Sequence, residues 1–354
     1  MVDGVSLAPG HEISRVIRGG WQLAGDHGPV DRARAIRDME AFVDAGVTTF
    51  DCADIYTGVE EMIGAFLADL RRRRPEAAAR VKVHTKLVPD LSLLETLSPR
   101  DVEAVVDRSL ARLGVERLDL VQFYWWDTAR GDPVRGLEPL LRLRERGKIA
   151  HLGVTNWDVE ETARFAEAGF PLVSTQVQLS VLDRRAEGAL AGWAAAHGIQ
   201  LLAFGTLAGG FLTEGWRGRP DPGFAFENRS LVKYRLIIDE FGPWDRFQRL
   251  LETLHAVGAR HGTDLSAVAT AWALGRPGVA AAIVGARYAR HLPRTLEAMR
   301  LRLSDADRDE IGAVIARGDG PSGPVFGLER DRTGRHGRIM KYELNADPKA
   351  AIGG

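Results

Sequence analysis

The chain of 354 residues has one cysteine, no excess of charge of either sign and no long apolar segment. The single cysteine, Cys52, cannot form an internal disulfide, and it excludes a metal site built from several cysteines. Lysine plus arginine (47) nearly balances aspartate plus glutamate (48), so no global field favours nucleic acid, an anionic membrane or a polyanionic substrate. We therefore expect a small-molecule partner, with no nucleic acid and no membrane.

Targeting and metal-binding signals are also lacking. Residues 1–16 contain no apolar run of signal-peptide length, and no later segment approaches the roughly eighteen apolar residues that a bilayer requires. A cytoplasmic protein is expected. The nine histidines show no HExxH or similar ligand spacing, so no metal site is expected. No heptad pattern indicates an interface, and the oligomeric state stays open.

Short apolar or β-branched runs alternate with helical patterns from end to end, which is typical of a parallel sheet. The eight expected strands are Arg15–Gly19, Thr48–Asp51, Val81–Lys86, Leu118–Tyr124, His151–Thr155, Leu172–Val177, Gln200–Phe204 and Ala280–Val284. Eight such strand and helix units favour a closed (β/α)8 TIM barrel, whose chemistry lies in the loops after the strands. We expect one domain over residues 1–354, with a core from about 15 to 317.

The helical patterns between these strands include two that a minimal barrel does not need. The expected helices are Arg32–Ala45, Glu60–Leu70, Pro99–Leu113, Pro133–Arg146, Glu160–Glu167 and Glu187–His197, with extra helices at Asp264–Leu274 and Ser304–Ala316. Residues 205–242, after the seventh strand, contain no convincing strand and are expected to be a long loop that covers a ligand. The tail, residues 318–354, is rich in glycine and charge and is expected to be loop outside the core.

Three residues at strand ends form a possible acid–base set. A phenol such as Tyr56 donates a proton poorly at neutral pH unless a nearby cation lowers its pKa. Alternation along the third strand places His84 and Lys86 on one face, and a lysine that faces into a barrel must be paired. Asp51, at the end of the preceding strand, is the natural partner. The alternative is a structural Lys–Asp pair beside an ordinary loop tyrosine.

Several motifs, taken in their order, resemble those of the aldo-keto reductases, which are NAD(P)H-dependent carbonyl reductases built on a (β/α)8 barrel. The motifs are Phe50-Asp51-Cys52-Ala53-Asp54-Ile55-Tyr56 with Glu61 and Ile63-Gly64, then Thr85-Lys86, Leu118-Asp119-Leu120, Gly153-Val154-Thr155-Asn156, Gln176 and Ile283-Val284-Gly285-Ala286-Arg287. The resemblance runs from about residue 18 to about residue 303. It implies reduction of an aldehyde or ketone to an alcohol, with Tyr56 as the general acid, Lys86 lowering its pKa and Asp51 holding Lys86.

One position departs from the family pattern. The fourth strand of the family normally ends in a catalytic histidine, whereas this chain has Tyr124. Tyrosine donates one hydrogen bond but is bulkier and takes up no proton at neutral pH. Three outcomes follow: a reductase for a specialised substrate, a cofactor-binding regulatory protein with attenuated turnover, or a lyase or isomerase that uses Tyr124 and Lys86. We favour the first because Tyr56, Lys86 and Asp51 are all present.

The resemblance also implies a nicotinamide cofactor site. The matching residues are Thr155, Asn156 and Gln176 for the carboxamide, Phe204 for stacking, Gly205, Thr206 and Leu207 for the pyrophosphate, and Gly285, Arg287 and Arg294 for the adenosine phosphate. Because an arginine fork suits a phosphate monoester better than a ribose hydroxyl, NADPH is expected over NADH. Arg294 stands where the family commonly has an acidic residue. The alternative for these arginines is solvated surface charge.

Aromatic residues near the strand ends are candidates for a substrate pocket. Trp21, Trp125 and Trp126 either line this pocket or simply pack in the core, and the sequence does not distinguish the two. The tail segment around residues 337–342 is expected to close over the pocket, as such loops do in the family.

Overall fold

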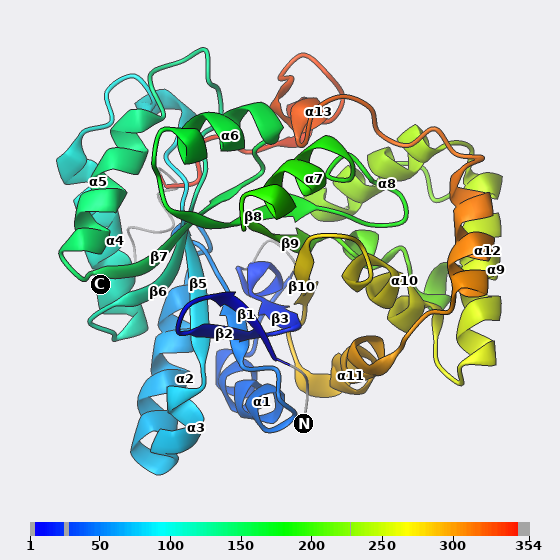
Figure 1. The fold of residues 1–354 in the computed structure, drawn as a ribbon. Helices are drawn as coiled ribbons and strands as arrows, with labels where there is room; N and C mark the ends of the chain where they lie inside the picture. The colour runs from blue at the N-terminus through cyan, green and yellow to red at the C-terminus, as the bar shows by residue number, and fades with distance from the viewer. Residues whose placement is uncertain (1–3, 25–27, 227, 346–354) are drawn as a thin grey trace.

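The computed structural model describes residues 4–24, 28–226 and 228–345 of the chain. Eight parallel strands close into a barrel in the order β10-β3-β4-β5-β6-β7-β8-β9 (Figure 1). They are β3 (Val16–Gly19), β4 (Thr49–Asp51), β5 (Lys82–Leu87), β6 (Leu118–Phe123), β7 (Ile149–Thr155), β8 (Leu172–Gln178), β9 (Gln200–Phe204) and β10 (Val279–Gly285). The predicted (β/α)8 fold and all eight predicted strands are confirmed.

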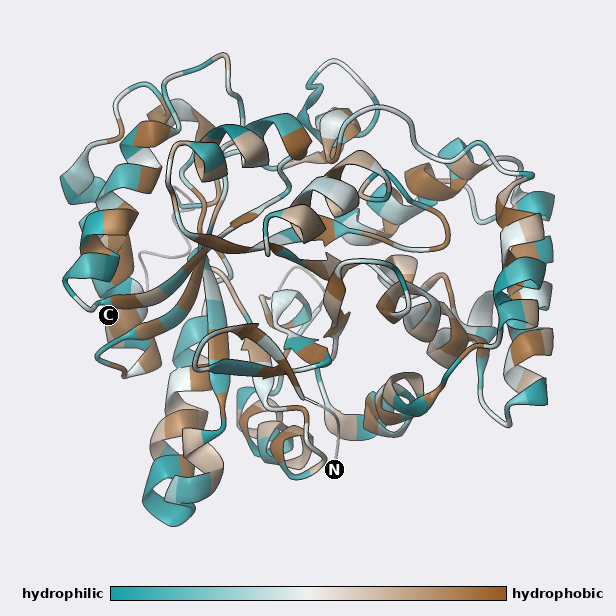
Figure 2. Ribbon diagram, in the orientation of Figure 1, coloured by the Kyte–Doolittle hydropathy of each residue, from teal (hydrophilic) through white to brown (hydrophobic). Residues whose placement is uncertain are grey.

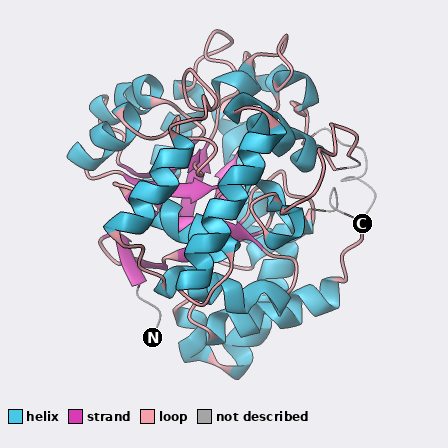
Figure 3. Ribbon diagram, turned by 90° about the vertical axis from the view of Figure 1, so that its right-hand side faces the viewer, coloured by secondary structure: helices cyan, strands magenta, loops and turns pink. Residues whose placement is uncertain are grey.

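Helices cover the outside of the barrel (Figure 3). They are α1 (Arg32–Asp44), α2 (Val59–Arg73), α3 (Pro75–Ala79), α4 (Pro99–Leu113), α5 (Val134–Glu145), α6 (Val159–Glu167), α7 (Ala189–Ala196), α8 (Arg229–Phe241), α9 (Trp244–Arg260), α10 (Leu265–Leu274), α11 (Leu292–Arg300), α12 (Asp305–Ile315) and α13 (Gly327–Arg330). Brown apolar faces alternate with teal polar faces along several of them (Figure 2). None of the described helices is long and apolar enough to cross a bilayer.

Local sequence explains where α4 begins and ends. The Ser98 hydroxyl accepts a hydrogen bond from the Asp101 amide, and the Asp101 carboxylate accepts one from the Ser98 amide, which forms a capping box. Pro99 follows at the first helical position, where its missing N–H is not needed. Gly114 ends the helix with a φ of 61°, a conformation that glycine adopts without steric cost. These signals are local, so the sequence predicted this helix at its observed bounds.

A hairpin that the sequence analysis did not predict closes one end of the barrel. It consists of β1 (Gly4–Ala8) and β2 (His11–Ser14), which pair antiparallel and lie across the barrel in Figure 1. Leu7 and Ile13 of the hairpin belong to the same buried cluster as residues Ile17 and Leu120 of the barrel strands. The hairpin therefore fills the amino-terminal end of the barrel and leaves the carboxyl ends of the strands for a site.

The prediction of a long loop over residues 205–242 was wrong in its second half, which forms α8. Asn228 caps this helix by accepting a bond from the Ser230 amide. The next helix, α9, was also not predicted. Helix α8 contains β-branched residues of modest helix propensity, and it is stabilised by burying residues such as Ile237 and Phe241 in the core.

The tail was predicted to lie outside the core, and this was wrong for part of it. Val325 and Phe326 are buried in the main hydrophobic cluster, and Glu329 of α13 is fully buried against Arg185. Isolated apolar residues among glycines and charges carry no periodic signal, so only the folded chain reveals their burial. Residues 346–354 of the predicted tail lie outside the described part of the chain.

Candidate active site

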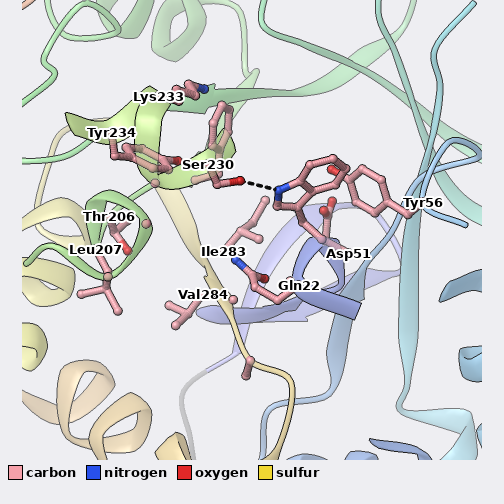
Figure 4. Close-up of a pocket in the computed structure, with 18 of the residues that line it drawn as sticks. Gln22, Asp51, Tyr56, Thr206, Leu207, Ser230, Lys233, Tyr234, Ile283 and Val284 are labelled. Atoms are coloured by element: carbon pink, nitrogen blue, oxygen red, sulfur yellow. Dashed lines mark hydrogen bonds between the residues drawn. The ribbon is translucent and has the colours of Figure 1, made fainter. Parts of the chain in front are cut away.

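A cavity of about 690 Å³ opens at the carboxyl ends of the barrel strands. Asp51, Tyr56, Lys86 and Tyr124, the predicted catalytic residues, all contribute to its lining. Figure 4 shows Asp51 and Tyr56 on one side of this cavity. The structure thus brings together residues that the sequence spreads over more than seventy positions.

The Asp51–Lys86 pair lies at the base of the cavity. The Lys86 ammonium donates hydrogen bonds to Asp51 Oδ2 at 2.6 Å and to the Cys52 carbonyl at 2.8 Å. Both side chains are 5% exposed, so the charges are removed from bulk water and must neutralise each other. Burial lowers the pKa of Lys86, but Asp51 and Tyr56 outweigh it and raise the pKa above its usual value. Lys86 is therefore a charged ammonium at neutral pH.

Two glutamine side chains hold the other oxygen of Asp51. Gln176 donates to Asp51 Oδ1 at 2.7 Å and to Gln122 Oε1 at 3.0 Å, and Gln122 donates to the same Asp51 oxygen at 3.2 Å. The sequence analysis did not single out Gln122. The signal was present, because Gln122 lies two residues before Tyr124 and two after Leu120, on the inward face of β6.

Tyr56 lies in the loop after β4 and contacts both Lys86 and Trp21. Lys86 Nζ lies 5.0 Å from the Tyr56 ring centroid, and the Trp21 ring centroid lies 4.9 Å away. Burial raises the pKa of Tyr56 to about 12, while Lys86 opposes this rise. Lys86 therefore lowers the pKa of Tyr56 as predicted, but desolvation of the phenolate is the larger effect and the net shift is upward.

Two further buried carboxylates, Glu60 and Asp54, support the loop that carries Tyr56. Glu60 accepts a hydrogen bond from Thr85 at 2.7 Å and pairs with Arg112 at 3.3 Å. Asp54 accepts a bond from the Val88 amide at 3.2 Å. Burial, together with the charge of Glu60, raises the pKa of Asp54 to about 8. Thr85 points outward to these groups while Lys86 points inward, which confirms the alternation predicted for this strand.

Tyr124 directly follows β6 and is buried among aromatic rings. Its ring meets Trp126 edge-on at 4.8 Å and Phe326 at 6.0 Å between centroids. The Arg330 guanidinium carbon lies 5.5 Å from the Tyr124 centroid. Burial raises the pKa of Tyr124, with Arg330 opposing. Within the described residues its hydroxyl has no hydrogen-bond partner, so it is available to a ligand.

The three candidate pocket tryptophans separate into two groups. Trp21 and Trp126 line the cavity. Trp125 does not, because its indole nitrogen donates to the carbonyls of Asp127 and Arg130 and its ring packs on Phe123. Adjacent residues of an extended chain point to opposite sides, so Trp125 and Trp126 cannot both face the cavity. Trp125 is a core residue.

All the predicted cofactor residues lie along the same cavity. They are Thr155, Asn156, Gln176, Phe204, Gly205, Thr206, Leu207, Gly285, Arg287 and Arg294. The oxygens Oδ1 of Asn156 and Oγ1 of Thr206 are buried and have no hydrogen-bond partner among the described residues. Buried polar atoms without a protein partner are costly, and a ligand with amide and phosphate groups would satisfy them. The donor set fits a nicotinamide nucleotide.

The basic residues after β10 are positioned by neighbours from other elements. Arg18 is buried and donates to the Arg287 carbonyl at 3.1 Å, which ties this loop to β3. Arg294 pairs with Asp264 at 2.7 Å and is half exposed. Part of the Arg294 guanidinium is therefore already engaged in an ion pair with a carboxylate of this chain.

Comparison with known proteins identifies the family of this chain. The model of the Aldo/keto reductase family matches residues 15–316. The chain belongs to this family. Aldo-keto reductase YhdN of Bacillus subtilis (strain 168) is 27% identical over 329 residues, which cover 90% of this chain and 95% of YhdN.

Solved structures agree as well. The glycerol dehydrogenase AKR11B4 from Gluconobacter oxydans superimposes with a TM-score of 0.73 at 26% identity, covering 92% of this chain and 97% of that one. An aldo-keto reductase from Klebsiella pneumoniae in complex with NADPH shares the fold, with a TM-score of 0.68 at 22% identity over 91% and 97% of the two chains. The predicted family is confirmed.

This aldo-keto reductase also has pocket residues that the sequence analysis missed, chiefly Lys233 and Tyr234 of α8. Both lie in the segment that was predicted to be loop, so no periodic pattern indicated which side chains would point into the cavity. In the described part of the chain, no group of three or more His, Cys, Asp or Glu side chains is arranged to hold a metal ion.

Proposed function

We propose that this protein reduces an aldehyde or ketone to an alcohol with NADPH, and that Tyr56 supplies the proton. The observation that carries the proposal is the buried set of Tyr56, Lys86 and Asp51 at the wall of a cavity that also holds the cofactor-binding residues. Each member of this set has a defined chemical task.

The cofactor supplies a hydride to the carbonyl carbon when it is bound. Thr155, Asn156 and Gln176 would hold its carboxamide next to the catalytic set. As the carbonyl oxygen gains negative charge, Tyr56 transfers its phenolic proton to that oxygen. The resulting phenolate is stabilised by the Lys86 ammonium, and Asp51 keeps Lys86 in place. One hydride and one proton give the alcohol, and Tyr56 regains its proton from solvent.

The pKa values set the starting protonation state of each group. The raised pKa of Tyr56 also makes the phenol a weaker acid, and the Lys86 ammonium counteracts this by favouring the phenolate. A Tyr56 pKa of about 12 keeps the phenol protonated throughout the neutral range. The raised pKa of Lys86 keeps the ammonium charged over the same range. The acid and its stabiliser therefore both start in the form that the reaction uses.

Preference for NADPH over NADH rests on the basic segment after β10. Arg287, Arg290 and Arg294 all line the cavity within eight residues of one another. A phosphate monoester on the adenosine ribose would be received by such a cluster, whereas the ribose hydroxyl of NADH gains little from it. Fluorescence titration with both cofactors tests this preference.

The main test is Tyr56→Phe, which removes the proton donor and keeps the ring. We expect carbonyl-dependent NADPH oxidation to fall by about 10² to 10⁴, the range for loss of a general acid. NADPH affinity measured by fluorescence should not change. Tyr342→Phe is the control, because Tyr342 lies in the tail and binds the carbonyls of Glu329 and Gly337.

Equal loss of turnover in the two variants would contradict the proposed role of Tyr56. A second candidate function, a cofactor-binding regulatory protein, is favoured by Tyr124 in place of the usual histidine. It predicts tight NADPH binding with background turnover in the wild type, and a gain of turnover in Tyr124→His.

A further inference from the structure

Lys233 is a buried cation that the proposed reaction does not use. It lies on α8, across the cavity from Asp51 and Tyr56 (Figure 4). Its side chain is 13% exposed, and its ammonium lies 4.8 Å from the Phe326 centroid and 5.2 Å from that of Phe204. The aromatic faces attract the charge but accept no conventional hydrogen bond.

No carboxylate in the described residues accepts a hydrogen bond from Lys233. The nearest is Glu329, whose Oε1 lies 3.8 Å from the ammonium. Glu329 is already held by Arg185, which donates to Oε1 at 3.2 Å and to Oε2 at 3.0 Å. Arg185 in turn binds both oxygens of Asp183. Lys233 is therefore attracted by this cluster, while its N–H donors remain available to a ligand in the cavity.

The charge distribution of the cavity favours an anion. Seven basic residues line it, namely Lys86, Arg229, Lys233, Arg287, Arg290, Arg294 and Lys341. Among the described lining residues the one acidic side chain is Asp51, which is paired with Lys86. Lys86 is paired with Asp51, Arg294 with Asp264, and Lys233 lies 3.8 Å from Glu329, yet the lining itself carries more basic than acidic side chains, which favours anionic ligands.

The position of Lys233 assigns it to the substrate end of the cavity. The candidates for the adenosine phosphate follow β10 and those for the pyrophosphate follow β9. Lys233 lies between Phe204, the candidate for stacking on the nicotinamide, and Phe326, which in turn meets Tyr124 edge-on. Tyr124 and Trp126 form the adjoining aromatic wall. An apolar body lying on this wall would place a terminal carboxylate within reach of the ammonium.

We propose that Lys233 binds the carboxylate of the carbonyl substrate, so that the enzyme prefers aldehydes or ketones carrying an acidic group on an apolar body. This proposal rests on the proposed reductase function. Burial lowers the pKa of Lys233 and Glu329 opposes this only in part. A bound carboxylate, like Glu329, would raise the pKa of Lys233, and it would also accept a hydrogen bond from the ammonium.

The test compares 4-carboxybenzaldehyde with its neutral methyl ester, methyl 4-formylbenzoate, under NADPH saturation. We expect the wild type to prefer the acid in kcat/KM by about tenfold or more, since a hydrogen bond to a charged group is worth that factor. Lys233→Met should abolish the preference by raising KM for the acid, with little change for the ester. Lys233→Arg should retain part of it.

Lys341→Met is the matched control, because it removes a second lysine that lines the same cavity from the tail. Equal loss in this variant would assign the effect to the general positive potential and overturn the proposal. Weaker NADPH binding in Lys233→Met would also overturn it, because the lysine would then serve the cofactor phosphates.

Failure of the reductase function can be told apart from failure of this proposal. If the wild type turned over neither aldehyde, calorimetric binding of the product analogue 4-(hydroxymethyl)benzoate would still test Lys233. Binding that is lost in Lys233→Met supports the carboxylate site, and equal binding by both proteins contradicts it.

Discussion

Tyr124 has a buried hydroxyl that no group in the described residues satisfies. Its ring is held between Trp126 and Phe326, which fixes the position of the hydroxyl oxygen. A protein normally pairs or removes such a group, because an unsatisfied buried hydroxyl costs about 1 to 3 kcal/mol. A hydroxyl kept in a cavity wall next to a catalytic set is suited to donate to a substrate carbonyl.

The variant Tyr124→Phe separates the cost of the unpaired hydroxyl to stability from its contribution to catalysis. We expect thermal stability equal to or above that of the wild type, since the variant removes an unpaired polar atom and keeps the ring. We expect kcat/KM to fall about tenfold, because one hydrogen bond to the carbonyl is lost. Thermal melting and steady-state kinetics measure the two effects. A less stable variant with unchanged kinetics would show that the hydroxyl has a structural role instead.

Among the proposed catalytic residues, the pairing of Lys86 with Asp51 was predictable and the pKa of Tyr56 was not. Strand alternation places Lys86 inward, and chain order makes β4 its neighbour, so Asp51 is the nearest carboxylate. The pKa of Tyr56 depends on how completely the phenol is removed from water. That quantity is set by Trp21 and other cavity residues from distant parts of the chain.

At the scale of elements, the hairpin β1–β2 joins the barrel through a group of histidines. His11 of β2 lies 2.9 Å from His84 of β5, measured between the Nε2 atoms, and its ring lies 4.8 Å from that of His151 of β7. Burial, followed by His151 and Lys82, lowers the pKa of His11 to about 3. The pKa values of His84 and His151 are also lowered by burial and by neighbouring basic groups, including Arg117 and Arg144.

These shifts predict loss of stability in mild acid. The unfolded chain binds protons at these histidines below about pH 6.5, whereas the folded chain resists protonation at His11 down to about pH 3. The free energy of unfolding should therefore fall as the pH drops from 6.5. His11→Gln removes one titrating group and keeps a polar partner for His84. Between pH 6.5 and 5 we expect it to lose about 2 kcal/mol less than the wild type.

Urea unfolding at several pH values between 5 and 7.5 measures this difference. Parallel pH profiles for the two proteins would contradict the assignment to His11. Hydrogen exchange of the β1 and β2 amides adds a local readout, because protonation of His11 should open the hairpin before the barrel unfolds.

In the molecule as a whole, the end of the tail, residues 342–345, is attached to the loop after β5 at Asp90 and Leu91. Asp90 Oδ1 accepts hydrogen bonds from the Leu344 amide, the Asn345 amide and the Asn345 side chain, at 2.9 to 3.1 Å. The Leu91 amide donates to the Tyr342 carbonyl. Met340 and Leu344 line the cavity, so the tail forms part of its wall, as expected for residues 337–342.

Asp90→Ala should release this attachment without disturbing the catalytic set. We expect KM for the carbonyl substrate to rise several-fold, because the cavity wall formed by Met340 and Leu344 loses its anchor. NADPH affinity should stay unchanged, since the cofactor candidates lie on β7 to β10. Asp90→Asn keeps one acceptor oxygen and should fall between the two. A change in NADPH affinity with constant KM would place the tail at the cofactor instead.

The amino-acid sequence alone was sufficient to predict the barrel, the strand that carries each proposed catalytic residue and the inward direction of Lys86. These properties follow from periodicity and chain order, which are local and survive without any knowledge of distant contacts. The bounds of α4 follow in the same way from its capping residues.

Four features could be seen only in the folded chain, namely the helix α8, the hairpin, the buried part of the tail and the environment of Lys233. Each of these depends on groups that meet across the fold, as Arg185 and Glu329 do at a separation of 144 positions. The pKa of Tyr56 and the outward position of Trp125 belong to the same class. Burial and pairing are properties of the assembled chain, because water is excluded only when distant segments pack together.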